Sequence, residues 1–145
     1  MRRIATLAVT ERGLFHTMNG KNLTVIGTGY WGKNLGRNFH QLGVLKAVCD
    51  GDPGILTRMS ETYPGLEATD DPDAVLNDPG TRVVIIAVPA ALHSGLAEKA
   101  LNAGKHVFVE TPLSLNFADG AKLVRLAAQR CPACGVSVGD LPSHD

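Results

Sequence analysis

The sequence lacks an excess of either charge. Its 145 residues include 14 Lys and Arg side chains against 14 Asp and Glu side chains, so the formal net charge is zero. Proteins that bind nucleic acids usually show a basic excess or a basic stripe, and no such feature appears in this sequence. We therefore expect no nucleic-acid partner.

Long hydrophobic runs are also missing. The longest, residues 83–92, contains a proline and is far too short to span a bilayer. The apolar stretch at residues 4–9 is interrupted by Glu11 and Arg12, which is too early for a secretory signal. We expect a cytoplasmic protein with no membrane contact, in which residues 1–20 form a disordered extension. An organelle or export leader is the alternative for that segment.

Cysteine is scarce as well. Three cysteines are too few and too irregularly spaced for a disulfide framework, which favours a reducing compartment. Cys49 lies in an apolar segment and is expected to be buried. Cys131 and Cys134 form one CxxC pair, which supplies only two of the four ligands that a structural zinc needs. Because this pair follows a helix instead of preceding one, we interpret it as a loop and expect no metal site.

What the sequence does contain is a regular alternation of two patterns. Short apolar runs that predict buried strands alternate with segments of helical periodicity. The strands are expected at residues 23–26, 44–49, 66–69, 82–88, 106–110 and 136–138. This order predicts an α/β fold of the Rossmann type, a doubly wound parallel sheet with helices on both faces and the strand order 3-2-1-4-5-6.

The helices between these strands show apolar faces and capping signals. Asp52-Pro53 and Asp71-Pro72 each pair a capping residue with a first-turn proline. Apolar residues at helical spacing mark the expected buried faces of the two later helices. They are Leu92, Leu96, Ala100 and Ala103 in one, and Phe117, Ala121, Val124 and Ala128 in the other.

A glycine-rich turn directly follows the first strand and opens the first helix. It reads Gly27-Thr28-Gly29-Tyr30-Trp31-Gly32, which matches the GxGxxG pattern of dinucleotide-binding proteins. In that pattern the first glycine permits a tight turn, the second lets the backbone approach a pyrophosphate, and the third lets helix and strand pack closely. Tyr30 and Trp31 either shield the pyrophosphate, touch a substrate, or simply pack.

Asp50 closes the second strand, where an acid can bind the ribose hydroxyls of the cofactor. A carboxylate there would repel a 2′-phosphate, so NAD is favoured over NADP. The alternative is that Asp50 only caps the turn before Pro53. Together with the glycine turn, Asp50 predicts an NAD site.

Four segments of the chain resemble the N-terminal domain of the Gfo/Idh/MocA oxidoreductases. They are residues 25–32, 48–50, 86–89 with His93, and 104–110, and the resemblance extends over residues 22–139. It implies hydride transfer between NAD(P) and a carbohydrate hydroxyl or ketone, and within the family it is closest to members acting on nucleotide sugars. It also implies a second, C-terminal domain that supplies most substrate contacts, a catalytic histidine and often a dimer surface.

The resemblance adds candidate residues at the ends of the fourth and fifth strands. Ala87 and Pro89 are expected at the cofactor, and Glu110 near the nicotinamide ribose. His93 either contacts cofactor or substrate, or is an exposed histidine at a helix start. The dinucleotide-binding domain is expected over residues 21–139, with residues 140–145 as a tail that includes His144.

Two departures from the family pattern bear on catalysis. The family's Glu-Lys-Pro motif reads Glu110-Thr111-Pro112 here, and a threonine hydroxyl is a poor general acid or base at neutral pH. The substrate domain of the family is absent from this sequence, so we expect a truncated or split product. Three functions stay open: an NAD-binding half of a sugar dehydrogenase, an active enzyme alone or completed by a homo-oligomer or partner chain, and a non-catalytic NAD or CoA module.

Overall fold

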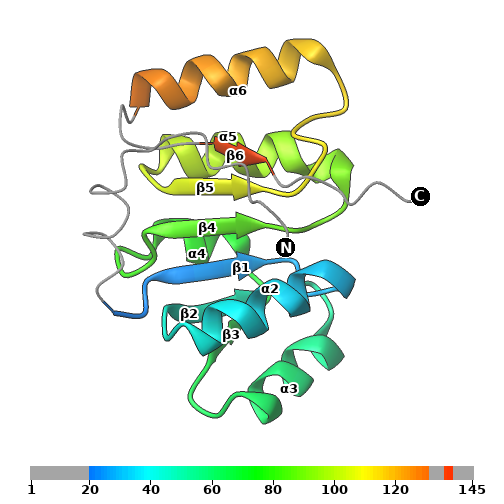
Figure 1. Ribbon diagram of the computed structural model, residues 1–145, viewed down its shortest axis with the longest axis vertical. Coiled ribbons are helices and arrows are strands. Elements are labelled where there is room, and N and C mark those ends of the chain that lie inside the picture. Colours follow the sequence, from blue (N-terminus) through cyan, green and yellow to red (C-terminus); the bar gives the residue numbers. More distant parts are fainter. Residues whose placement is uncertain (1–19, 131–135, 139–145) are drawn as a thin grey trace.

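The computed structural model describes residues 20–130 and 136–138, and its strands form one parallel sheet in the order β3-β2-β1-β4-β5-β6. This is the predicted Rossmann order. The strands are β1 (Leu23–Ile26), β2 (Leu45–Cys49), β3 (Glu67–Thr69), β4 (Val83–Ile86), β5 (His106–Val109) and β6 (Val136–Val138). Their carboxyl ends lie at one edge of the sheet, where α2 and α5 begin (Figure 1).

The helices connect these strands as the sequence predicts. They are α2 (Tyr30–Gln41), α3 (Pro53–Thr62), α4 (Pro72–Asn77), the short 3₁₀ helix η1 (Ala90–Leu92), α5 (His93–Asn102) and α6 (Phe117–Arg130). The Asp52 carboxylate accepts a hydrogen bond from Gly54 N, and that of Asp71 accepts one from Asp73 N, which confirms both predicted caps. Within residues 20–130 and 136–138, no helix combines the length and apolar character needed to cross a membrane.

Each face of the sheet is covered by its own set of helices. One core cluster joins Ile26 and Ile86 to buried residues of α4, α5 and α6, such as Leu101. The other joins Val25 and Ile85 to side chains of α2 and α3. Because neighbouring residues of one strand enter opposite clusters, the central strands β1 and β4 are buried at every position and are apolar except at Thr24. This explains why they read as continuous apolar runs.

The predicted buried face of α5 is confirmed at Leu96 and Ala100, whereas α6 turns a different face to the sheet from the one expected. Residues predicted to be buried but found exposed are Leu92, Ala103, Phe117, Val124 and Ala128. In α6 the buried positions are instead Leu123 and Ala127. Each residue turns a helix by about 100°, so a second apolar set can lie on the adjacent face, and periodicity does not choose between the two.

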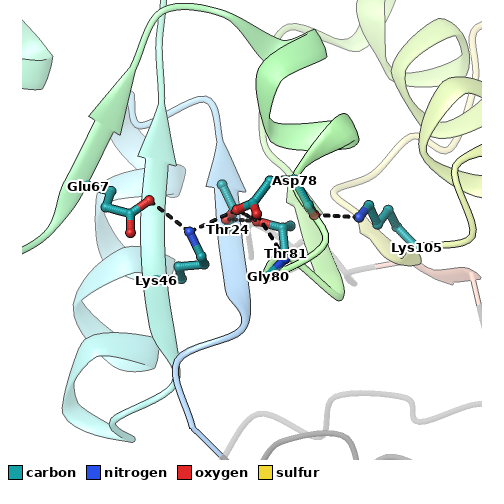
Figure 2. A network of polar contacts seen from close by, with 7 residues as sticks. All are labelled: Thr24, Lys46, Glu67, Asp78, Gly80, Thr81 and Lys105. Carbon is teal, nitrogen blue, oxygen red and sulfur yellow. Dashed lines mark hydrogen bonds and ion pairs between the residues drawn. The ribbon is translucent and has the colours of Figure 1, made fainter.

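The amino edge of the sheet carries a polar network (Figure 2). Lys46 Nζ lies 2.7 Å from a Glu67 carboxylate oxygen and 2.8 Å from an Asp78 carboxylate oxygen. Thr24 and Thr81 join their hydroxyls at 3.0 Å, and Lys105 Nζ donates to the carbonyl oxygen of Asp78 at 2.7 Å. The network therefore ties β1, β2 and β3 to the loops that precede β4 and β5. It lies at the opposite edge from the glycine turn.

Candidate dinucleotide-binding site

The glycine turn is packed so tightly that two of its positions accept no side chain. Gly27 has a φ of 89°, and a Cβ atom there would lie 2.7 Å from the backbone carbonyl carbon and oxygen of Ala87. A Cβ atom on Gly32 would lie 1.7 Å from the carbonyl oxygen of Gly27. The first glycine therefore permits the turn and its contact with the segment after β4, and the third lets α2 start against β1.

Gly29 differs from these two glycines because its missing side chain faces open space. A Cβ atom built there would meet no atom within 4 Å outside its chain neighbours. Gly29 is also the N-cap of α2, with no side-chain capping bond and no acidic residue in the first turn. The first N–H groups of a helix have no intrahelical partner, and the helix dipole favours an anion beside them. The residues present thus fit a pyrophosphate approaching the backbone at Gly29.

The Asp50 carboxylate ties the end of β2 to the glycine turn. Its Oδ2 accepts hydrogen bonds from Thr28 N at 2.8 Å and from Thr28 Oγ1 at 3.1 Å. Its Oδ1 accepts from Asp52 N at 2.9 Å, which is the turn-capping contact expected as the alternative role. A carboxylate has about four acceptor positions, so these contacts leave capacity for ribose hydroxyls. Sequence reasoning missed the buried Thr28 as the partner of Asp50.

A groove of about 590 Å³ lies beside the turn, between α2 and α3. Its walls include Thr28, Gly29 and Tyr30 and the cations Lys33, Arg37 and Arg58. Tyr30 and Trp31 are 71% and 39% exposed and pack edge to face, with ring centroids 5.2 Å apart. The sequence analysis did not single out these cations. Lys33 and Arg37 lie one helical turn apart, which is the signal that could have found them.

The segments after β4 and β5 form the other side of the site. Ala87 N donates to Ile26 O, and Glu110 N donates to Ile86 O, so both segments continue the sheet hydrogen bonding at its carboxyl edge. Burial raises the pKa of Glu110, while the neighbouring His93 and a backbone N–H group act in the opposite direction. These contacts bring Ala87 and Glu110 to the same edge as Gly27.

Thr111 occupies the position of the family's motif lysine. Its Oγ1 is buried and has no hydrogen-bond partner among the described residues. The Thr111–Pro112 peptide bond is cis. A buried hydroxyl without a partner is unusual in proteins, and it is an available donor and acceptor at this edge. It carries no charge, so it does not replace the lysine as an acid.

His93 is not the exposed helix-start residue that the sequence allowed as an alternative. Its side chain is 2% exposed. Its Nε2 lies 2.6 Å from the carbonyl oxygen of Val88, and its Nδ1 lies 2.6 Å from the carbonyl oxygen of Pro112. His93 is the first residue of α5, and its ring lies between the segments that follow β4 and β5.

Other chemistry-bearing residues do not join the site. Within the described ranges, no group of three or more His, Cys, Asp or Glu side chains could hold a metal ion. Cys49 is buried, as predicted. The CxxC pair at residues 131–134, the extension at residues 1–19, and the tail with His144 lie outside the described residues.

A family model described as an oxidoreductase family with an NAD-binding Rossmann fold, Gfo/Idh/MocA, matches residues 21–138. The chain belongs to this family. The match covers the glycine turn, Asp50 and the segments after β4 and β5, and the observed strand order agrees with it. The resemblance derived from the sequence motifs is therefore confirmed.

Two relatives of the chain are named for reactions of a dTDP-sugar and of scyllo-inositol. The chain is 44% identical over 71 residues to a dTDP-3,4-didehydro-2,6-dideoxy-alpha-D-glucose 3-reductase from Streptomyces violaceoruber, which covers 49% of this chain and 20% of that protein. It is 36% identical over 94 residues to the scyllo-inositol 2-dehydrogenase (NAD(+)) of Bacillus subtilis, covering 63% of this chain and 26% of the relative.

Solved structures show the same fold. A crystal structure of scyllo-inositol dehydrogenase from Lactobacillus casei with bound NAD(H) and scyllo-inositol superposes with a TM-score of 0.75 at 27% identity. The superposition covers 83% of this chain and 36% of that chain. The chain therefore spans about a third or less of the length of these relatives, in the part that holds the NAD-binding Rossmann fold.

Proposed function

We propose that the chain holds NAD at the carboxyl edge of its sheet and provides the cofactor half of a sugar or nucleotide-sugar oxidoreductase. The observation that carries this proposal is the uncapped start of α2 at Gly29, open to an anion and bordered by Asp50. We assign residues 21–139 as the dinucleotide-binding domain, which the family match over residues 21–138 supports.

Each side of the site would hold a different part of the cofactor. The turn N–H groups and the α2 N-terminus would bind the pyrophosphate, with Tyr30 and Trp31 covering it. Asp50 would accept the adenosine ribose hydroxyls, which favours NAD over NADP because its charge opposes a 2′-phosphate. Ala87, Pro89 and Glu110 would line the nicotinamide side. His93 stays outside this set, because both ring nitrogens are bonded within the chain.

The cofactor supplies the hydride chemistry when bound, and the chain's residues bind and orient it. Relatives named as a dTDP-sugar 3-reductase and as a scyllo-inositol 2-dehydrogenase support a polyol or nucleotide-sugar substrate for the whole activity. In such a reaction a proton must also move to or from the substrate oxygen. Thr111 Oγ1 can orient that oxygen by a hydrogen bond, but an acid or base must come from elsewhere.

Titration of the full chain with NADH, followed by cofactor fluorescence, tests the binding proposal. We expect saturable binding of NADH, weaker binding of NADPH, and a loss of at least about tenfold in affinity for Asp50→Ala. Asp70→Ala is the matched control, because Asp70 is an exposed acid at the end of the neighbouring strand. Absence of NADH binding by the folded wild-type chain at millimolar cofactor would refute the proposal.

A second candidate function is favoured by Thr111 itself. A chain without the motif lysine that still binds a nucleotide could act as a non-catalytic NAD or CoA module. An assay of NAD reduction with scyllo-inositol, myo-inositol and dTDP- or UDP-sugars separates the two, run with the chain alone and with a co-expressed candidate partner chain. Turnover in any arm supports the oxidoreductase, whereas flat traces combined with thermal stabilisation by CoA support the binding module.

A further inference from the structure

His93 makes two contacts that a neutral histidine cannot make together as hydrogen bonds. Nε2 and Nδ1 each lie 2.6 Å from a peptide carbonyl oxygen, one of Val88 and the other of Pro112. A carbonyl oxygen only accepts hydrogen bonds, and a neutral imidazole carries a single N–H group. Both contacts are therefore hydrogen bonds only when each ring nitrogen carries a proton.

The surroundings of the ring support a positive charge. With 2% of its surface exposed, the ring has little access to water, and a buried charge needs a nearby partner of opposite sign. Glu110, after β5, interacts electrostatically with His93. Charged groups on the adjoining helices are paired elsewhere: Glu98 of α5 with Lys122 of α6, and Lys99 of α5 with Asp73 of α4.

The two carbonyl groups belong to the two segments that flank the proposed nicotinamide side. Val88 follows Ala87, whose backbone packs against Gly27, and a Cβ atom on Gly27 would lie 2.8 Å from Val88 N. Pro112 follows Thr111, the residue at the motif-lysine position. The ring of His93 thus links the wall behind the glycine turn to the segment that carries Glu110 and Thr111.

We propose that His93 is a positioning residue, an imidazolium whose two N–H groups fix residues 87–89 relative to residues 110–112. It acts through these two segments and does not touch the cofactor. Loss of its second proton removes one of the two hydrogen bonds and sets a nitrogen lone pair against a carbonyl oxygen. The two segments then separate, and the nicotinamide side of the site loses its geometry. This last consequence rests on the proposed function.

The protonation state is tested first, on the wild-type full chain, by ring ¹⁵N NMR at neutral pH. The His93 ring is identified by its contacts with protons of Val88 and Pro112. We expect both of its nitrogens to be protonated. His106 is the internal control, because burial lowers its pKa and its Nδ1 has no partner among the described residues, so it should be neutral. A His93 ring with a single N–H proton overturns the proposal.

The effect on the site is tested by NADH affinity at neutral pH. His93→Gln should bind NADH about tenfold more weakly than the wild type, because glutamine does not reproduce the two ring N–H groups that hold the carbonyl oxygens of Val88 and Pro112. His40→Gln is the matched control, since His40 is exposed on α2, and it should follow the wild type.

The outcomes separate this proposal from the proposed function. Wild-type affinity in a folded His93→Gln chain contradicts the positioning role. If the His93→Gln chain does not fold, the NMR measurement on the wild type decides, because it needs no variant. If the wild type binds no NADH, the function fails, and the NMR result still decides the state of His93.

Discussion

At the amino edge of the sheet a network of charged and polar side chains is paired within the chain, whereas at the carboxyl edge the start of α2 and the hydroxyl of Thr111 have no such partner among the described residues. Lys46, Asp78 and Lys105 are engaged at distances of 2.7–2.8 Å. At the other edge α2 starts without a side-chain cap, and Thr111 Oγ1 is buried without a partner among the described residues. The network stabilises the first edge, and the groups without a partner at the second edge are those that the proposed NAD site would use.

The same division holds inside the glycine turn. Gly27 and Gly32 are required by the fold, because a Cβ atom at either would overlap backbone atoms. Gly29 is not required by the fold, since its Cβ would meet nothing within 4 Å. Gly29 suits both an N-cap, where glycine is preferred to alanine, and the approach of an anion to its backbone. The turn thus combines two glycines that packing requires with one that the proposed NAD site would use, and substitutions can separate them.

The largest effect is expected for Gly32→Ala. Alanine is favoured over glycine in a helix by about 1 kcal/mol, but a Cβ atom 1.7 Å from the Gly27 carbonyl oxygen must displace the turn or α2. Such overpacking against backbone costs about 3 kcal/mol or more, so the clash dominates. Urea denaturation should show this loss. A variant as stable as the wild type would mean that α2 does not start against β1 as described.

Gly29→Ala should behave in the opposite way. Its Cβ atom meets open space, so the free energy of unfolding should fall by only about 1 kcal/mol, because alanine is a poorer N-cap than glycine. NADH affinity should fall at least about tenfold, because the methyl group occupies the path of the pyrophosphate. Urea denaturation and NADH titration on one preparation measure both. Unchanged NADH affinity would show that the pyrophosphate does not bind at Gly29.

How far the sequence could predict these two edges depends on the range of the interactions. The glycine turn, the strand order and the caps at Asp52 and Asp71 follow from local spacing, and all three were predicted. The amino-edge network joins Lys46 to Asp78 and Lys105 across the chain, and no periodicity marks such pairs. For the same reason the burial of His93 could not be predicted from the sequence. Its ring contacts Val88, 5 residues before it, and Pro112, 19 residues after it.

Asp78→Asn removes the ion pair between Lys46 and Asp78 at the amino edge. The hydrogen bond from Lys46 and that from Gly80 N lower the pKa of the Asp78 carboxyl. A lowered pKa stabilises the folded state above the ordinary carboxyl range, and this stabilisation is lost as pH falls through the lowered value. At neutral pH we expect Asp78→Asn to be about 1–2 kcal/mol less stable than the wild type. Below about pH 4 this difference between variant and wild type should become smaller. Urea denaturation at a series of pH values measures both.

The matched control for this change is Asp73→Asn. Asp73 pairs with Lys99 on the surface, where the side chains are 63% and 61% exposed, and exposed ion pairs contribute little. It should leave the acid dependence of stability as in the wild type, and NADH affinity should be unchanged in both variants. An equal loss of stability in the two variants would show that the amino-edge network stabilises the fold no more than an exposed ion pair does.

Thr28→Val tests the tie between the glycine turn and β2 with a change that keeps the side-chain shape. It removes the Oγ1–Asp50 bond of 3.1 Å and keeps the N–H bond of 2.8 Å. We expect a loss of about 1 kcal/mol of stability and a fewfold loss of NADH affinity, because Asp50 keeps one of its two bonds to the turn. Thr57→Val, at an exposed threonine of α3, is the control. If Thr28→Val bound NADH as tightly as the wild type, the hydroxyl of Thr28 would contribute to stability only.

The smallest effect is expected at Cys49, the last residue of β2. A test of its accessibility shows how far the accessible part of the carboxyl edge extends. Cys49 is 1% exposed, and burial, with a smaller contribution from Asp50, raises the pKa of its thiol to about 11. The thiolate is the reactive form, so a raised pKa keeps the thiol protonated and unreactive at mildly alkaline pH. Alkylation of the native chain with iodoacetamide, read peptide by peptide by mass spectrometry, should leave Cys49 unlabelled, whereas the urea-unfolded chain should be labelled fully. If native Cys49 were labelled at the rate of the unfolded chain, the carboxyl edge would be accessible to reagents as far as Cys49. The accessible groups would then not be confined to the glycine turn and Asp50.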